Sequence, residues 1–99
     1  MNNIEEKDIE KTLVSNIEQM GGLCLKWVSP GCSGVPDRIV ILPGGNVHFV
    51  ELKTTGKKVR PRQRAVIKRL RNLGCFVWEI DSLEMISRMI ESICGEEVM

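Results

Sequence analysis

Residues 37–53, DRIVILPGGNVHFVELK, decide the fold of this 99-residue chain. Apolar and β-branched residues dominate Asp37–Leu42 and Val47–Lys53, and Pro43–Asn46 between them carries the proline and glycines of a tight turn. Two such runs around such a turn are typical of a β-hairpin. The run from Ile39 to Leu42 is apolar without alternation, which indicates a strand covered on both faces. The sequence therefore predicts a hairpin inside a sheet that has helices on both sides.

The register expected for this hairpin brings three charged side chains together. A three-residue loop pairs Leu42 with Asn46, and continuing the pairing outward brings Asp37 opposite Glu51. The Cβ atoms of directly opposite residues are about 4.5–5.5 Å apart. Because side chains alternate along a strand, Lys53 falls on the same face as Glu51. We therefore expect two carboxylates and one ammonium group at one end of the hairpin.

The sequence on either side of the hairpin predicts three helices and two further strands. They are expected at residues 5–20 (helix), 23–28 (strand), 61–73 (helix), 75–80 (strand) and from 81 or 82 onward (helix). The resulting order is α-β-β-β-α-β-α. About twenty residues that include a helix join the third and fourth strands, a length that permits a right-handed parallel crossover. We therefore predict an α/β fold with a mixed four-stranded sheet flanked by helices.

The apolar spacing in each helix predicts the face that packs inward. In the first helix this face carries Ile9, Leu13, Ile17 and Met20, and in the second it carries Ala65, Val66, Leu70 and Leu73. In the final helix it carries Leu83, Ile86, Ile90 and Ile93. Asp81 or Ser82 can cap this helix, with Glu84 placed for a capping-box contact to Asp81. We expect residues after Gly95 to fray, so one domain fills residues 1–99 with its core at about 5–94 and a tail at 95–99.

Composition places the chain among ordinary globular domains. Apolar residues make up 42% and charged residues 27%, so a single core is expected. No apolar run approaches the roughly 20 residues that cross a bilayer, and the polar N-terminus does not resemble a signal peptide. The four cysteines lack CxxC spacing and His48 is the only histidine, which argues against a zinc site. We expect a cytoplasmic protein with free thiols and no membrane association.

Positive charge is concentrated in one part of the sequence, although the net charge is only +1. No acidic residue occurs between Leu52 and Trp78, while this stretch holds nine of the fourteen lysines and arginines. They are Lys53, Lys57, Lys58, Arg60, Arg62, Arg64, Lys68, Arg69 and Arg71. A patch of one sign on a nearly neutral protein is typical of a binding site for a polyanion. Rather than a solvated helix face, we expect phosphate contacts from the members that precede or open the second helix, namely Lys57, Lys58, Arg60, Arg62 and Arg64.

The facing acids Asp37 and Glu51 predict a site for a cation. Two carboxylates this close repel each other and do not both stay ionised without a positive charge between them. A hard divalent ion such as Mg²⁺ binds carboxylate oxygens and lowers the pKa of a bound water. Lys53 can orient or deprotonate that water, or bind a phosphate. The alternative is that Asp37 caps the entrance to its strand, while Glu51 and Lys53 form an exposed pair at a strand end.

Gly34-Val-Pro-Asp37, the hairpin, Val50-Glu-Leu-Lys53 and Gln63 on the following helix resemble the motif of PD-(D/E)XK nucleases. More narrowly, the chain resembles the stand-alone virus-type replication-repair nuclease (VRR-NUC) domains of phages, from the first helix to about Ser82. The resemblance implies a restriction-endonuclease-like core that uses Mg²⁺ or Mn²⁺ and no small-molecule cofactor. It implies Asp37 and Glu51 as metal ligands together with the Leu52 carbonyl, Lys53 as the catalytic lysine and Gln63 as a helper. A glutamate on the first helix completes such sites; Glu6 and Glu10 both match, and Glu6 fits better.

The resemblance also implies hydrolysis of phosphodiester bonds in branched DNA, including four-way (Holliday) junctions, by a homodimer in the bacterial host cell. No element is left over to read base edges, which favours recognition of DNA shape. The final helix, with Met85 and Met89, either supplies the contact between subunits or completes the core of each. Arg38 either contacts a phosphate or projects outward. The alternatives to an enzyme are an inactive nucleic-acid-binding module and an accessory protein of phage replication.

Overall fold

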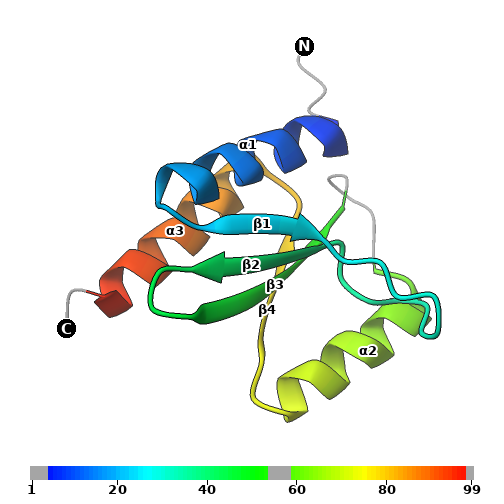
Figure 1. The fold of residues 1–99 in the computed structure, drawn as a ribbon. Helices are drawn as coiled ribbons and strands as arrows, with labels where there is room; N and C mark the ends of the chain where they lie inside the picture. Colours follow the sequence, from blue (N-terminus) through cyan, green and yellow to red (C-terminus); the bar gives the residue numbers. More distant parts are fainter. Residues whose placement is uncertain (1–4, 54–58, 98–99) are drawn as a thin grey trace.

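The computed structural model describes residues 5–53 and 59–97, so Lys57 and Lys58 lie outside the described residues. Its elements follow the predicted order (Figure 1). They are α1 (Glu6–Gln19), β1 (Leu23–Lys26), β2 (Arg38–Leu42), β3 (Asn46–Leu52), α2 (Pro61–Asn72), β4 (Phe76–Ile80) and α3 (Leu83–Glu97). The predicted α/β fold and its α-β-β-β-α-β-α order are therefore confirmed.

The sheet is mixed, as predicted, and has the order β1-β2-β3-β4. β1 and β2 pair antiparallel, as do β2 and β3, while β3 and β4 pair parallel across the connection that contains α2. Leu42 pairs with Asn46, so the register predicted for the hairpin is confirmed. Gly44 and Gly45 have φ values of 89° and 82°, in the left-handed region that glycine adopts without strain. This short loop sets the register of the two strands that carry the predicted site.

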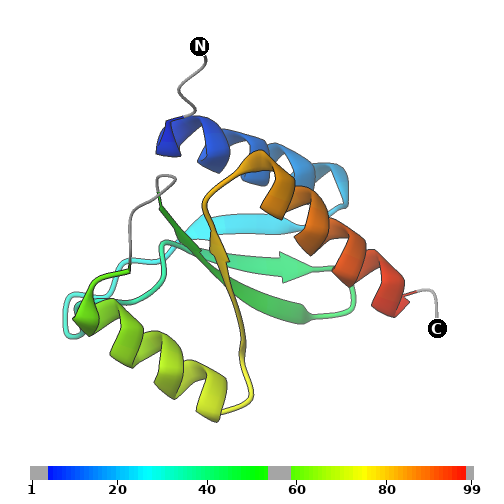
Figure 2. The ribbon, with the colours of Figure 1, turned by 180° about the vertical axis from the view of Figure 1, so that it is seen from behind.

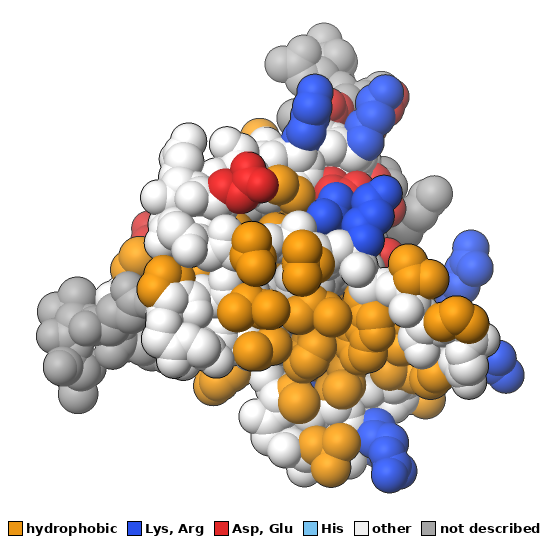
Figure 3. Space-filling view, in the orientation of Figure 1, with side chains coloured by type: hydrophobic (Ala, Val, Ile, Leu, Met, Phe, Trp, Pro, Cys, Tyr) orange, Lys and Arg blue, Asp and Glu red, His pale blue; other side chains and the backbone are white. Residues whose placement is uncertain are grey.

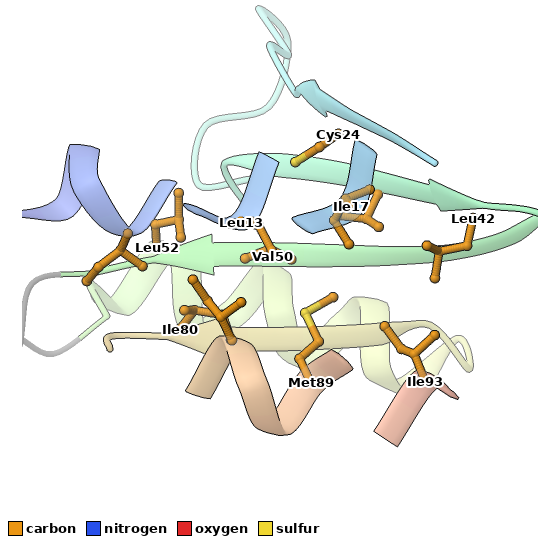
Figure 4. Packing of buried hydrophobic residues seen from close by; sticks show 12 residues of the cluster. Leu13, Ile17, Cys24, Leu42, Val50, Leu52, Ile80, Met89 and Ile93 are labelled. Carbon is orange, nitrogen blue, oxygen red and sulfur yellow. The ribbon is translucent and has the colours of Figure 1, made fainter. Parts of the chain in front are cut away.

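One face of the sheet is covered by α1 and α3, and the main core lies between these helices and the strands (Figures 1 and 2). α1 contributes Ile9, Leu13 and Ile17, and all three are fully buried, as their spacing predicted. They pack with buried residues of the strands and of α3 (Figure 4), namely Cys24, Val40, Leu42, Val50, Leu52, Ile80, Ile86, Met89 and Ile93. Met89 is fully buried and Met85 packs against the same cluster. The methionines of α3 therefore complete the core of the monomer, which is one of the two roles considered for them.

α2 lies on the opposite side of the sheet, next to β4 (Figure 2), and its predicted inward face is confirmed only in part. Ile67 is its fully buried residue. Of the four residues predicted to face inward, Val66 and Leu70 are partly buried, whereas Ala65 and Leu73 are exposed. Arg64 and Arg71 lie on the same side of the helix as Ile67 and pair with Glu79 of β4. Both arginine side chains stay exposed, at 48% and 43%, while they pair with Glu79.

Much of this second face of the sheet stays open, whereas cover on both faces was predicted from the apolar run. Leu23 and Leu25 of β1 are 55% and 45% exposed, and Val47 of β3 is 41% exposed. Ile39 and Ile41, which pair with them across the strands, are only partly buried. We call these five residues the open sheet face. Figure 3 shows the broad apolar surface to which they belong.

α3 begins after Ser82, whose Oγ accepts a hydrogen bond from the Met85 backbone N–H at an N–O distance of 3.2 Å. Of the two residues considered, Ser82 therefore caps the helix. The capping box predicted between Glu84 and Asp81 does not fit this start, and Glu84 pairs with Arg88 at 2.6 Å. The helix continues through Gly95 to Glu97, and the fraying expected after Gly95 stays a prediction. No helix in the described part of the chain is long and apolar enough to cross a membrane.

Candidate active site

Asp37 stands immediately before β2 and is held by both neighbouring strands. Its main-chain oxygen accepts a hydrogen bond from Trp27 N at 3.0 Å. Its Oδ2 accepts a hydrogen bond from Leu52 N at 2.7 Å, which ties the carboxylate to β3. Arg38 pairs with Val50. The same antiparallel register, extended by one residue, brings Asp37 opposite the acid Glu51. The hairpin therefore positions Asp37 as its register predicted.

Glu51 is that opposite acid, and only 4% of its surface is exposed. Its Oε2 accepts a hydrogen bond from Gln63 Nε2 at 2.8 Å, so α2 brings Gln63 to the site as predicted. Its Oε1 is buried and has no hydrogen-bond partner among the described residues. Burial, followed by the nearby charge of Asp37, raises the pKa of Glu51 from 4.5 to about 7. Burial also raises the pKa of Asp37, although the Leu52 N–H opposes this rise.

The two raised pKa values and the unpartnered oxygen indicate that these acids lack a compensating positive charge. A divalent cation fits such a pair, because it neutralises two carboxylates and supplies a partner for a buried oxygen. In residues 5–53 and 59–97, no group of three or more acidic, histidine or cysteine side chains has metal-binding spacing. The described site thus offers two carboxylates as ligands. Mg²⁺ completes an octahedral shell with further oxygen ligands, such as a main-chain carbonyl and waters.

The two glutamates of α1 considered as further ligands, Glu6 and Glu10, differ in their contacts. Both line a cleft of about 270 Å³ beside the ends of the strands. The charge of Glu6 raises the pKa of Glu51, and that of Glu10 raises the pKa of Asp37, so both lie near the acids. Glu10 Oε2 is only 2.8 Å from Arg38 Nε. Glu10 is therefore paired with Arg38, and Glu6 stays the glutamate that the motif favours as the ligand on this helix.

Arg38 has a role that the sequence did not predict. Its side chain is 13% exposed and, besides Glu10, contacts the main-chain oxygen of Cys24 through Nη1 at 3.0 Å. It therefore connects α1 with β1, and its contact with a phosphate stays a prediction. Side chains alternate along β2, so the residue after Asp37 points to the side covered by α1.

Lys53 follows β3 and lies near an acid that the sequence analysis missed. Its Nζ is 3.6 Å from Glu79 Oε1. Glu79 is the partner of Glu51 in the parallel register of β3 and β4, so it projects from the same face of the sheet. It also accepts two hydrogen bonds from Arg64, at 2.8 and 2.7 Å. In the sequence, the only sign of this role is that Glu79 is the first acid after the stretch without acids.

The described residues of the predicted DNA-binding set fall into two groups. Arg60 and Arg62 open α2 and are exposed. Arg62 donates a hydrogen bond to Ser33 Oγ at 2.5 Å, and a Cβ on Gly34 would lie 3.0 Å from the Arg62 main-chain oxygen. The loop before β2 therefore packs closely on this turn of α2. Arg64 forms the second group, because it pairs with Glu79, an acid that is distant in the sequence.

Known proteins share both the sequence and the fold of this chain. The family model of the VRR-NUC domain matches residues 5–83. The chain belongs to the VRR-NUC family. A solved structure described as a VRR_NUC domain matches with a TM-score of 0.83 and 36% identity, over 87% of this chain and 94% of that one. The protein named "Putative nuclease p44", from Acyrthosiphon pisum secondary endosymbiont phage 1, is 48% identical over 84 residues, which are 85% of this chain and 90% of that protein.

Family membership confirms the resemblance and the fold that the motif predicted, and it makes this protein a nuclease of the VRR-NUC type. DNA is the substrate that such a domain implies. In this VRR-NUC chain, Asp37, Glu51 and Gln63 meet at one end of the sheet. Lys53 lies two residues after Glu51, directly after the end of β3. The arrangement brings together the residues that the motif had joined only by their order in the sequence.

Proposed function

We propose that this VRR-NUC protein is an Mg²⁺- or Mn²⁺-dependent endonuclease that cuts branched DNA, including four-way junctions, as a homodimer. One observation carries the catalytic part, namely the buried Oε1 of Glu51 without a partner among the described residues. Buried acids with a purely structural role have their oxygens satisfied by hydrogen bonds. An acid that holds a metal ion keeps an oxygen available for it, as Glu51 does.

In this proposal Asp37 and Glu51 hold the metal, with the Leu52 carbonyl and a glutamate of α1 as further ligands. A bound divalent ion lowers the pKa of a coordinated water and stabilises negative charge on the phosphate. Gln63 orients Glu51 through its Nε2, and the Leu52 N–H orients Asp37 through its Oδ2. Such hydrogen bonds keep metal ligands in place. Lys53 orients the attacking water or stabilises the phosphate charge with its ammonium group.

The charge and the small size of the chain support recognition of DNA by shape. Arg60 and Arg62 lie exposed next to the loop that precedes Asp37, and Lys57 and Lys58 are close to them in the sequence. Contacts of such residues with phosphates position DNA without reading its sequence. The helices and strands of the described residues all belong to the nuclease core, so none of them is spare for reading base edges in a groove. Branched DNA offers a shape that backbone contacts can distinguish.

The open sheet face supports the homodimer. Its apolar side chains are exposed together, and the apolar surface extends to a groove of about 380 Å³ between α2 and the loop before β2 (Figure 3). This groove is lined mainly by apolar residues, among them Trp27, Val35, Val66, Leu70 and Leu73. Large contiguous apolar patches are uncommon on monomeric proteins. A second copy related by a two-fold axis would cover the same surface on both subunits.

The homodimer is tested with Leu25→Asp, which places a charge on the open sheet face. Leu83→Asp is the matched control, because Leu83 is an equally apolar, 41% exposed residue at the start of α3. Size-exclusion chromatography with light scattering should show a dimer for the wild type and for Leu83→Asp, and a monomer for Leu25→Asp. A monomeric wild type would reject the homodimer, and a dimeric Leu25→Asp variant would reject this interface.

Cleavage is tested with labelled four-way junction, flap and linear duplex in Mg²⁺ or Mn²⁺. Asp37→Ala is compared with Glu91→Ala, which removes an exposed acid of α3. We expect the wild type and Glu91→Ala to cut branched substrates and Asp37→Ala to cut none. Binding without cutting by the wild type would favour the inactive binding module, and neither binding nor cutting would favour the accessory protein. Cutting that survives in Asp37→Ala would place the active site elsewhere.

A further inference from the structure

Three cations converge on Glu79 of β4. Arg64 donates to both carboxylate oxygens, with Nη1–Oε2 at 2.8 Å and Nη2–Oε1 at 2.7 Å. Arg71 Nη1 lies 3.2 Å from Oε2, and Lys53 Nζ lies 3.6 Å from Oε1. The side chain of Glu79 is 17% exposed, and the hydrogen bonds from Arg64 lower its pKa to about 2. Glu79 is therefore a fixed negative charge at neutral pH.

Glu79 is also the neighbour of Glu51 in the sheet. The two acids are partners in the parallel register of β3 and β4, and their side chains project from the same face. Consecutive residues of α2 reach them, since Gln63 donates to Glu51 and Arg64 donates to Glu79. The first turn of α2 is thus attached to two adjacent strands through two adjacent acids.

Arg71 gives Glu79 a second attachment to α2. It lies about two helical turns after Arg64, near the other end of the helix. Besides its contact with Glu79, its Nη2 donates to the Val77 main-chain oxygen at 2.6 Å. α2 is therefore fixed to β4 near both of its ends. Because Gln63 belongs to the same helix, its contact with Glu51 depends on these attachments.

We propose that Glu79 is a positioning residue of the nuclease, which holds Lys53 beside the metal-binding acids and fixes α2 so that Gln63 reaches Glu51. The inference rests on the function proposed above. A lysine ammonium is a compact charge on a flexible stem, so without Glu79 it is free to turn to Glu51, the acid on the same strand and face. There it would compete with the metal ion. Glu79 keeps Lys53 near the site without letting it occupy the site.

Loss of the Glu79 charge is expected to change DNA binding and DNA cleavage in opposite directions. Its charge offsets Arg64 and Arg71, and its two hydrogen bonds hold Arg64 away from phosphates. Loss of this charge releases Arg64 for DNA, so binding becomes tighter. The same loss misplaces Lys53 and Gln63, so cleavage becomes slower. A residue with a merely structural role would instead lower binding and cleavage together.

The test compares the wild type with Glu79→Gln, Glu79→Asp and Glu84→Gln on a four-way junction. Single-turnover cleavage in Mn²⁺ and metal-free binding are measured separately, and circular dichroism checks the fold. Glu84→Gln is the matched control, because it removes the glutamate partner of Arg88 on α3. For Glu79→Gln we expect a cleavage rate about 10–100-fold lower and an affinity at low salt about two- to five-fold higher. Glu79→Asp keeps the charge and should bind like the wild type and cut at an intermediate rate.

The proposal is overturned by a Glu79→Gln variant that cuts at the wild-type rate, or that loses binding and cleavage together. A wild type that cuts no DNA removes the proposed function, and NMR of the metal-free protein then decides the role of Glu79. We expect Glu79→Gln, but not Glu84→Gln, to shift the side-chain amide signals of Gln63 and to abolish the slowly exchanging guanidinium signal of Arg64. Unchanged signals in Glu79→Gln would overturn the positioning role independently of nuclease activity.

Discussion

Replacement of Glu51 by glutamine is expected to stabilise the metal-free protein while abolishing cleavage. Burial and the neighbouring Asp37 raise the pKa of Glu51 from 4.5 to about 7. Each unit of pKa corresponds to about 1.4 kcal/mol, so the ionised carboxylate costs about 3 kcal/mol of folding free energy above pH 7. Glutamine has a similar shape and no charge. The shift already includes the hydrogen bond from Gln63, which favours the ionised form, so the expected gain is about 3 kcal/mol.

The gain should depend on pH in a defined direction. Because the pKa of Glu51 is higher in the folded than in the unfolded protein, the folded state holds the proton more tightly. The stability of the wild type therefore falls as the pH rises from about 4.5 to about 7. The gain of Glu51→Gln is greatest above pH 7 and shrinks towards pH 4.5. In a domain of this size it corresponds to a rise in Tm on the order of 10 °C at pH 8.

Thermal melts followed by circular dichroism in EDTA, between pH 4.5 and 8, measure this gain. Glu84→Gln is the control, because it breaks an exposed ion pair of a kind that contributes only about 0–1 kcal/mol. Mg²⁺ or Mn²⁺ at about 100 times its Kd should stabilise the wild type by about 2.7 kcal/mol and leave Glu51→Gln unchanged. A gain of equal size at pH 5 and pH 8, or no gain at pH 8, would refute the reasoning.

Four further substitutions test the supporting contacts and the packing of α2. Gln63→Ala should weaken Mn²⁺ binding about 10–100-fold in calorimetric titrations, because Gln63 orients Glu51, and an unchanged affinity would contradict that role. Arg62→Ala should reduce the slope of log K against log salt by about 0.9 on duplex DNA, measured by metal-free fluorescence anisotropy; a wild-type slope would exclude a phosphate contact. Ile67→Ala should cost about 2–5 kcal/mol in urea unfolding, while Leu73→Ala should cost less than about 0.5 kcal/mol. Equal costs would contradict the rotation of α2.

The hairpin and its facing acids were predictable because they depend on neighbours in the sequence. A three-residue loop determines that Leu42 pairs with Asn46, and side-chain alternation then places Asp37, Glu51 and Lys53 at one end. The position of Gln63 does not follow from the hairpin, because Gln63 reaches Glu51 from α2, which returns to the ends of the strands. The family motif placed Gln63 at the site, and the 2.8 Å contact between the two side chains agrees with this placement.

The inward face of α2 was predicted only in part, because its apolar residues allow more than one such face. Hydrophobic spacing included Val66 and Leu70, which are partly buried, but it also included the exposed Leu73 and left out the fully buried Ile67. Arg64 and Arg71 lie beside Ile67, and an acid on the sheet pairs with them. Glu79 provides that acid from β4, and its position next to Glu51 follows from a parallel register that no local pattern specifies. α2 packs on β4, while the open sheet face lies on β1, β2 and β3.

The sequence by itself determined that two carboxylates and a lysine gather at the end of one hairpin. Only the tertiary structure decided which charges surround them. Arg38 and Glu10 are 28 positions apart in the chain, and Arg64 and Glu79 are 15 apart, yet each pair is in hydrogen-bonding contact. Electrostatic energy depends on distance in space and on burial, and both are set when the helices dock on the sheet.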